Sequence, residues 1–313
     1  MKRVVGPTAV ALCVLGAAGT LVRAQIQAPV GFPALGASPV ITIVSAGAEP
    51  RAAIRYAFTN GRKEHASMDL TMGVSVDMGG MSMPAMQMPT MHTGADLAVT
   101  DLSPAGDASY TLAFTDLTWV NSAGVDPAIM TALQSMGVDM KALSGSATVS
   151  PRGVSRNVVF DTSKITNPQV AQMMGSMSFT TQSLTMPFPE EPLGPGAHWV
   201  ARQTISVNGM QTFQKTDVEL VSRDATSCTL KTKLEQSAPA QTVTLPGLPP
   251  GVEASLESMT GTGTTTTTIH FDSLVPTSEG NVQTTAIMNV AMGGDTQRMT
   301  AQATVNLKVA PVK

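Results

Sequence analysis

Cysteine, aromatic residues and charge are all scarce in this chain. Its 313 residues include only two cysteines, 4% aromatic residues and 13% charged residues, with a formal net charge of −3. The two cysteines stand far apart in sequence, which excludes a CxxC metal or redox site. The charged residues form no basic stripe, which argues against a nucleic-acid partner. Hydrophobic residues make up 42% of the chain, so the composition favours a globular protein.

The first 24 residues have the pattern of an export signal. Lys2 and Arg3 precede an apolar run, and the sequence Val-Arg-Ala before Gln25 fits a small-x-small cleavage site. We therefore expect a signal peptide over residues 1–24, with cleavage near Ala24, and a periplasmic or secreted mature chain. No later apolar run reaches about 18 residues, so we expect no transmembrane helix in the mature chain.

Removal of this signal changes the charge and the cysteine count. Without Lys2, Arg3 and Arg23, the 19 basic residues fall to 16 against 22 acidic ones, a net charge of about −6. Cys13 follows a leucine and not a small residue, so a lipid anchor is not expected. Its removal leaves Cys228 alone, which excludes an internal disulfide. Cys228 lies in the alternating stretch TSCTLKTKL, and we interpret it as a buried structural thiol.

Most of the chain after residue 50 alternates apolar and polar residues, which is typical of β-strands. Turn sequences separate these stretches, including two Asn-Gly corners. The expected hairpins and meanders cover, in chain order, residues 52–78, 94–120, 143–161, 198–236 and 264–309. Long strands in antiparallel succession predict a mainly β fold, with a large curved antiparallel sheet or half-barrel.

The domain organisation follows from composition. Residues 25–50 are rich in Pro, Gly and Ala and form a lead-in with one short edge strand in VITIVSA. Residues 51–313 form a single β-rich domain. A weak internal similarity leaves open that this domain consists of two similar halves, about 51–186 and 197–310.

Two segments break the alternation and predict short helices. Residues 125–140 begin with Asp126 as N-cap and Pro127 at the first helical position, and residues 166–186 repeat this arrangement with Asn167 and Pro168. The second segment carries no charged residue, which suits packing under a sheet or in a groove. Its apolar face supplies the candidate contacts to an apolar ligand, Met173, Met174, Met177 and Leu184.

Long antiparallel strands interrupted by paired helices, behind an export signal, resemble the half-barrel of bacterial lipoprotein carriers of the LolA and LppX type. That resemblance implies a bent sheet wrapped around helices and a hydrophobic cavity, and it covers roughly residues 50–310. The stretch PEEPLGPGAHW also resembles an element of other exported bacterial envelope proteins. Neither resemblance carries catalytic residues, and the chain differs from the carriers in its methionine-rich insert.

Catalytic signatures are missing from the sequence. There is no GxSxG elbow, no HExxH, no phosphate-binding GxxxxGK[ST] and no EF-hand loop, and the four histidines stand singly. We therefore expect a protein that is not an enzyme and needs no cofactor. The run Thr264–Thr268 suits a strand through β-branching and predicts a polar face on an exposed sheet, without indicating a role.

Methionine is the abundant residue, with 21 copies. The stretch MSMPAMQMPTMH repeats Met-x-Met-Pro, and in an extended chain each Met-x-Met pair projects its thioethers to one side. Thioethers select Cu(I). The candidate copper ligands are Met81, Met83, Met86, Met88, Met91 and His92. The other interpretation is a hairpin's long loop with an adaptable apolar surface, because methionine is used throughout the chain.

These observations together favour one function and leave one alternative. We expect an exported, non-enzymatic bacterial envelope protein that binds an apolar, lipid-like ligand or an envelope protein partner on a curved sheet. The alternative is a periplasmic Cu(I)-binding protein that uses the Met-x-Met-Pro segment.

Overall fold

The computed structural model describes residues 26–78, 81–120, 125, 130–131, 133–134, 141, 143–161, 163, 165, 185–207, 210–243, 253–292 and 295–312. These residues form one 14-stranded antiparallel sheet. Its strands are β1 (Val40–Ser45), β2 (Lys63–Met78), β3 (Met81–Gln87), β4 (Thr90–Leu102), β5 (Ala108–Val120), β6 (Ser144–Val149), β7 (Ser155–Asp161), β8 (His198–Val207), β9 (Met210–Arg223), β10 (Ser227–Ala238), β11 (Gln241–Val243), β12 (Glu253–His270), β13 (Thr277–Met292) and β14 (Asp295–Val312). The predicted mainly β fold with a large curved sheet is confirmed.

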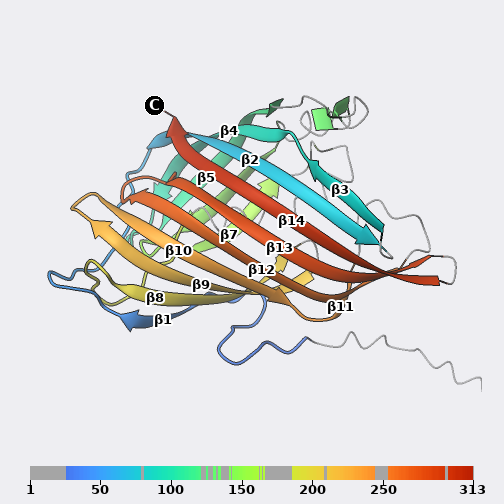
Figure 1. Ribbon diagram of the computed structural model, residues 1–313. Helices are drawn as coiled ribbons and strands as arrows, with labels where there is room; N and C mark the ends of the chain where they lie inside the picture. The colour runs from blue at the N-terminus through green and yellow to red at the C-terminus, as the bar shows by residue number, and fades with distance from the viewer. Residues whose placement is uncertain are drawn as a thin grey trace, which may run out of the picture.

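The sheet is curved but not closed. Its strand order is β1-β8-β9-β10-β12-β13-β14-β2-β4-β5-β6-β7, with β3 paired to β2 and β11 paired to β12. Figure 1 shows the long strands β12, β13, β14 and β2 running diagonally across the front, with β5 and β7 lying behind them. In the described part of the chain β1 and β7 are the two outer strands, and the gap between them is called the seam below.

One end of the curved sheet is filled by chain that belongs to no strand. Residues 51–58 and 186–197, together called the end plug, are joined by reciprocal hydrogen bonds between Ala52 and Leu193. The plug is also bonded to the loops of the sheet, since Tyr56 N donates to Pro151 O at 2.7 Å and Ala57 N donates to Phe271 O at 2.6 Å. This end of the molecule is called the closed end below.

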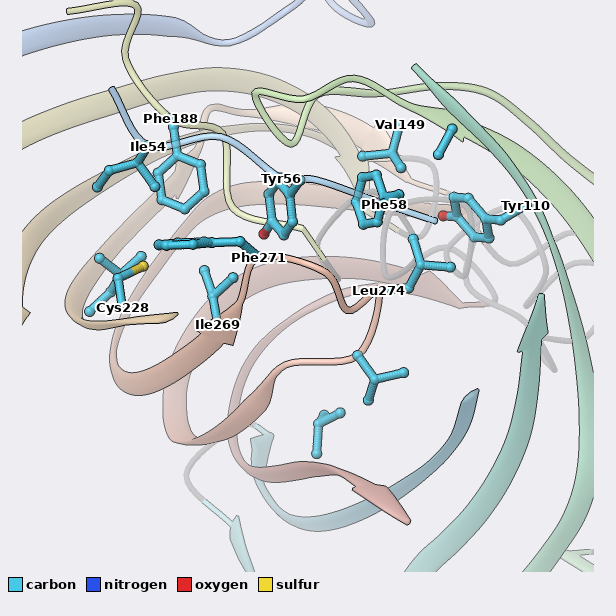
Figure 2. Close-up of a cluster of buried hydrophobic side chains, with 14 of the residues drawn as sticks. Ile54, Tyr56, Phe58, Tyr110, Val149, Phe188, Cys228, Ile269, Phe271 and Leu274 are labelled. Atoms are coloured by element: carbon cyan, nitrogen blue, oxygen red, sulfur yellow. The ribbon is translucent and has the colours of Figure 1, made fainter. Parts of the chain in front are cut away.

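Aromatic packing fixes the end plug inside the sheet. Figure 2 shows the rings of Phe188 and Tyr56 above Phe271 and Ile269, with the Phe58 ring beside Tyr56 and above Leu274. The Tyr56 and Phe58 rings stack with centroids 5.2 Å apart, and Phe188 lies 5.5 Å from Tyr56. Burial raises the pKa of the Tyr56 phenol and raises that of Tyr110 to about 12. The largest buried cluster of the described residues therefore lies at the closed end.

One sequence prediction for this region needs correction. Residues 52–58 alternate as predicted, with Ile54, Tyr56 and Phe58 buried, but they pair with the loops of the closed end and not with β2 in a hairpin. The Asn-Gly signal still marks the corner, where Gly61 has a φ of +78°. The hydrogen-bond partners differ because distant loops offer this segment a buried apolar environment that one hairpin cannot provide.

The two short helices are not borne out in the part of the chain that the structure describes. Only the isolated residues 130–131, 133–134 and 141 are helical there. Most of both expected helical segments, residues 125–140 and 166–186, lies outside the described residues.

The methionine-rich segment also differs from its prediction. Instead of a hairpin's long loop it forms β3, whose backbone pairs Met86 with Val74 and Met83 with Val76. The register shifts by one residue between these pairs, next to Pro84. A proline is tolerated in a strand at a sheet edge or beside such a bulge, because its missing N–H then removes no needed ladder bond.

Candidate ligand-binding face

Strand alternation separates an inner face, which looks into the curve of the sheet, from an outer face. Residues directly opposite each other in neighbouring strands project to the same face. On β12 the inward positions Thr267 and Ile269 are buried, whereas the alternate positions Thr266 and Thr268 are outward. The five threonines of the run are thus divided between the two faces, and the predicted polar outer surface holds for Thr264, Thr266 and Thr268.

Two inward rows cross seven strands between two buried clusters. The closed end lies on one side of these rows, and a smaller cluster of Ala238, Val243, Ala254, Leu256, Met259 and Met288 lies on the other. The first row is Ala201, Thr216, Leu234, Gly263, Val282, Val305 and Met72, and the second is Gln203, Gln214, Gln236, Gly261, Thr284, Ala303 and Val74. They are called the middle rows below.

The middle rows are apolar at the β13, β14 and β2 side. Val282, Val305 and Val74 are half-buried there, and the Met72 side chain is 37% exposed. The neighbouring inward positions continue the same character and are also half-buried: Leu70, Val76, Ala286, Ala301 and Leu307. No charged residue occupies an inward position of this patch, which is called the apolar side below. Its residues therefore present apolar surface that the fold has only partly removed from water.

Glycines shape the middle of this face. A Cβ built on Gly263 would lie 2.5 Å from Asn281 O and 2.8 Å from the Val282 side chain. Only a residue without a side chain therefore allows β12 and β13 to approach so closely at this point of the curve. The close approach helps to bend the sheet where the middle rows cross it.

The opposite side of the middle rows is polar but uncharged. Gln203, Gln214 and Gln236 lie opposite one another on β8, β9 and β10. Gln236 Nε2 donates to Gln214 Oε1 at 2.9 Å, and Gln214 Nε2 donates to Thr216 Oγ1 at 3.5 Å. Beside this amide ladder, a pocket of about 150 Å³ opens between β8, β9 and the segments 37–39, 153–155 and 185–187. It is called the seam pocket below, because it lies at the seam of the sheet.

The outer face has a different chemistry. One outward row alternates in charge across the sheet, through Glu219, Lys231, Thr266, Glu279, Lys308 and Asp69. A shallow groove of about 520 Å³ lies along this row and is lined mainly by Thr, Asn, Lys and acidic side chains. Opposite charges on neighbouring strands stabilise each other weakly in water. This outer groove is best explained as the solvated face of the sheet.

The predicted copper ligands are only partly brought together. Met81, Met83 and Met86 follow one another along β3, and their side chains lie outside the described part of the chain. Met88 is half-buried, and its backbone N–H donates to Met72 O at 2.9 Å.

Met91 and His92 are neighbours in β4, so their side chains project to opposite faces. His92 lies on the outer face, where its Nδ1 is 2.6 Å from Asp69 Oδ1. Met91 lies opposite Leu70 on the inner face. The two residues are therefore not arranged to bind one ion together.

The remaining predicted residues fall into two groups. Met173, Met174, Met177 and Leu184, the candidate apolar-ligand contacts, lie outside the described residues. Cys228 is 1% exposed in the closed-end cluster, and burial raises the pKa of its thiol to about 12. The predicted burial of Cys228 is confirmed.

Sequence reasoning missed the amide ladder, although a signal was present. On β8 the inward positions are Trp199, Ala201, Gln203 and Ile205. Gln203 is the one strongly polar residue among these otherwise apolar inward positions. A polar side chain at an inward position is informative, because buried polar groups need partners.

Comparison with known proteins adds no assignment. The sequence matches no protein-family profile and no curated protein sequence. Within the residues that the structure describes, no three His, Cys, Asp or Glu side chains are grouped so that they could hold a metal ion. The same residues include no helix that is long and apolar enough to cross a membrane.

Proposed function

We propose that this protein is an exported, non-enzymatic bacterial envelope protein that binds an apolar, lipid-like ligand on the inner face of its curved sheet. The observation that carries the proposal is the apolar side of the middle rows, where inward side chains are apolar, uncharged and only half-buried between two buried clusters. A folded protein gains about 25 cal/mol for each Å² of apolar surface removed from water. An apolar ligand on this face would supply that gain.

The contrast between the two faces supports this location. The outer row through Lys231, Glu279, Lys308 and Asp69 is charged, whereas the apolar side of the inner face carries no charge. Ligand sites are mostly apolar and concave, with a few placed polar groups. The inner face combines an apolar surface with the neighbouring amide ladder, and this combination favours it over the outer groove.

A pair of neighbouring substitutions on β14 tests the site. Ala303 is inward and half-buried, and Gln302 beside it is outward and exposed. The neutral dye N-phenyl-1-naphthylamine should fluoresce with the wild-type chain. Ala303→Glu should weaken its binding at least about tenfold, because a carboxylate in an apolar site must be desolvated. Gln302→Glu adds the same charge to the outer face and should change binding less than about twofold.

One result would contradict the proposed binding site. If Ala303→Glu binds the dye as tightly as Gln302→Glu does, the inner face is not the binding site. Circular dichroism and urea unfolding report whether Ala303→Glu is folded. Val305→Thr, a similar-sized polar replacement on the same face, provides a milder second variant whose dye affinity should fall by a few fold. Native mass spectrometry of protein purified from its own envelope should also show a bound lipid-like mass.

A further inference from the structure

The seam pocket has a neutral lining. Its walls contain the side chains of Gln203, Gln214, Thr216, Ser155 and Thr185, and no Asp, Glu, Lys, Arg or His is among its lining residues. A water molecule occupies about 30 Å³ of liquid volume, so a pocket of about 150 Å³ has the size of a small polar group such as glycerol. Such a lining can form hydrogen bonds but cannot neutralise an ionic charge.

Most polar groups of this pocket already have partners, and two of the described ones, the exposed Ser38 hydroxyl and the half-buried Gln203 amide, do not. Thr185 Oγ1 donates to Gly153 O at 2.8 Å and lies 3.1 Å from Ser155 Oγ. Gln214 is bonded to Gln236 and Thr216. The Gln203 side chain is half-buried and makes no hydrogen bond with any residue that the structure describes. Its amide therefore offers one acceptor oxygen and two N–H donors to a bound group.

The seam pocket and the apolar side belong to the same rows of the sheet. The second middle row runs without interruption from Gln203 through Gln214 and Gln236 to Thr284, Ala303 and Val74. Four strand spacings separate β9 from β14, which corresponds to about 19 Å along the sheet at about 4.8 Å per strand. That separation is on the scale of an extended long acyl chain.

We infer that the ligand is a neutral amphiphile, an acyl chain with an uncharged hydrogen-bonding head group of the monoacylglycerol class. The head group occupies the seam pocket and bonds to the Gln203 amide, while the chain crosses the middle rows toward Val282, Val305 and Met72. A carboxylate or phosphate head group is disfavoured, because it would lose its hydration in a pocket without a counter-charge. This inference rests on the proposed function and specifies its ligand.

Competition against the bound dye in the wild-type chain tests the head group. Monopalmitoylglycerol and palmitate share one chain and differ in head-group charge. Both are added below their aggregation concentrations at pH 8. Monopalmitoylglycerol should displace N-phenyl-1-naphthylamine at a concentration at least about tenfold lower than palmitate does. Equal or tighter binding of palmitate overturns the inference.

A matched pair of glutamine substitutions tests the residue. Gln203→Leu removes the free amide of the seam pocket, and Gln283→Leu makes the same change at an exposed outward position of β13. Gln203→Leu should weaken the binding of monopalmitoylglycerol about fivefold to tenfold relative to the binding of the dye, because it removes hydrogen bonds that only the head group can make. Gln283→Leu should change neither affinity.

The results separate this inference from the proposed function. If the wild type binds the dye but Gln203→Leu binds monopalmitoylglycerol as the wild type does, the inference fails and the proposed function remains. If the wild type binds neither the dye nor either lipid, the proposed function itself fails. The comparison of head groups uses only the wild-type chain, so it decides the inference even when Gln203→Leu does not fold.

Discussion

The closed end and the middle rows use the same strands to different effect. At the closed end, inward residues such as Leu220, Leu230 and Ile269 are at most 2% exposed beneath the end plug. Further along β10 the inward Leu234 is half-buried, and on β2, in the same row, Met72 is 37% exposed. Alternation alone therefore places a side chain on a face. What covers that face decides whether the side chain stabilises the fold or remains available for a ligand.

The largest expected effect separates the two regions by stability. Phe188→Ala removes a fully buried ring from the end plug and should lower the free energy of unfolding by about 3–5 kcal/mol. Met72→Ala should lower it by less than about 1 kcal/mol, because the Met72 side chain is already partly in water. Urea unfolding measures both. Equal losses would contradict a difference in packing between the regions.

A second contrast uses thiol reactivity. The pKa of Cys228 is raised from 9.0 to about 12, which reduces its thiolate at pH 8 by roughly a thousandfold. Iodoacetamide should therefore leave Cys228 unmodified in the native protein, as peptide mass mapping would show. In a Met72→Cys variant the new thiol should react readily, and monopalmitoylglycerol should slow that reaction. Rapid labelling of native Cys228 would show that the closed end opens easily.

The pH response is expected at the closed end. Asp224, in the β9–β10 turn, accepts hydrogen bonds from the backbone N–H groups of Thr226 and Ser227 at 2.7 and 2.8 Å. These bonds, together with those from the two hydroxyls, lower the pKa of the carboxyl group from 3.8 to about 2. Because the native state favours the ionised form, its contribution to stability is complete above pH 4 and disappears as the pH falls toward 2.

The substitution Asp224→Asn tests the direction of this pH dependence. The variant should be less stable than the wild type at neutral pH, and the difference between them should shrink between pH 4 and pH 2. Carbon NMR of the carboxyl groups should place the Asp224 midpoint near 2. A titration midpoint near 3.8 would show that the hydrogen bonds from Thr226 and Ser227 to the Asp224 carboxylate do not persist in solution.

The smallest expected effect concerns His92. This residue lies on the outer face beside Asp69, and its side chain is 39% exposed. An exposed contact between polar side chains contributes at most about 1 kcal/mol, so His92→Ala should change stability little. Its affinity for Cu(I), measured by anaerobic competition with a colorimetric chelator, should equal that of the wild type. A clear loss of Cu(I) affinity would restore His92 to the copper-site hypothesis.

The strands were predictable from sequence to a large extent. The hairpin of 94–120 folds as β4 and β5 around the Ser103–Asp107 turn, where Ser103 N donates to Asp107 O at 2.9 Å. Period-2 alternation and turn residues are local signals, and in this hairpin the structure has the strands and the turn that they predict. Which strands become neighbours is not local. Nothing in the β2 sequence specifies that it pairs with β14.

The candidate site was predicted less well, for the same reason. Gln203, Gln214 and Gln236 are separated in sequence and meet only through the register of three strands. The methionines of residues 81–92 attracted attention because they are contiguous, yet Met91 and His92 project to opposite faces. Residues 52–58 alternated as a strand would, but their partners came from loops that are distant in sequence. Residues that are neighbours in sequence can be recognised without a structure, whereas residues that meet only in the folded protein cannot.

The pairing of β2 with β14 has a consequence for folding. Among the described strands, β4, β5, β6 and β7 are joined through β2 to the rest of the sheet, and β2 is joined to it only by the ladder that links His65–Met78 to Met299–Val312. More than 200 residues separate these partners in sequence, and closing so long a loop has a high entropic cost and is slow. The two portions of the sheet cannot be joined until β14 is available, so assembly of the whole concave face should be among the last events of folding.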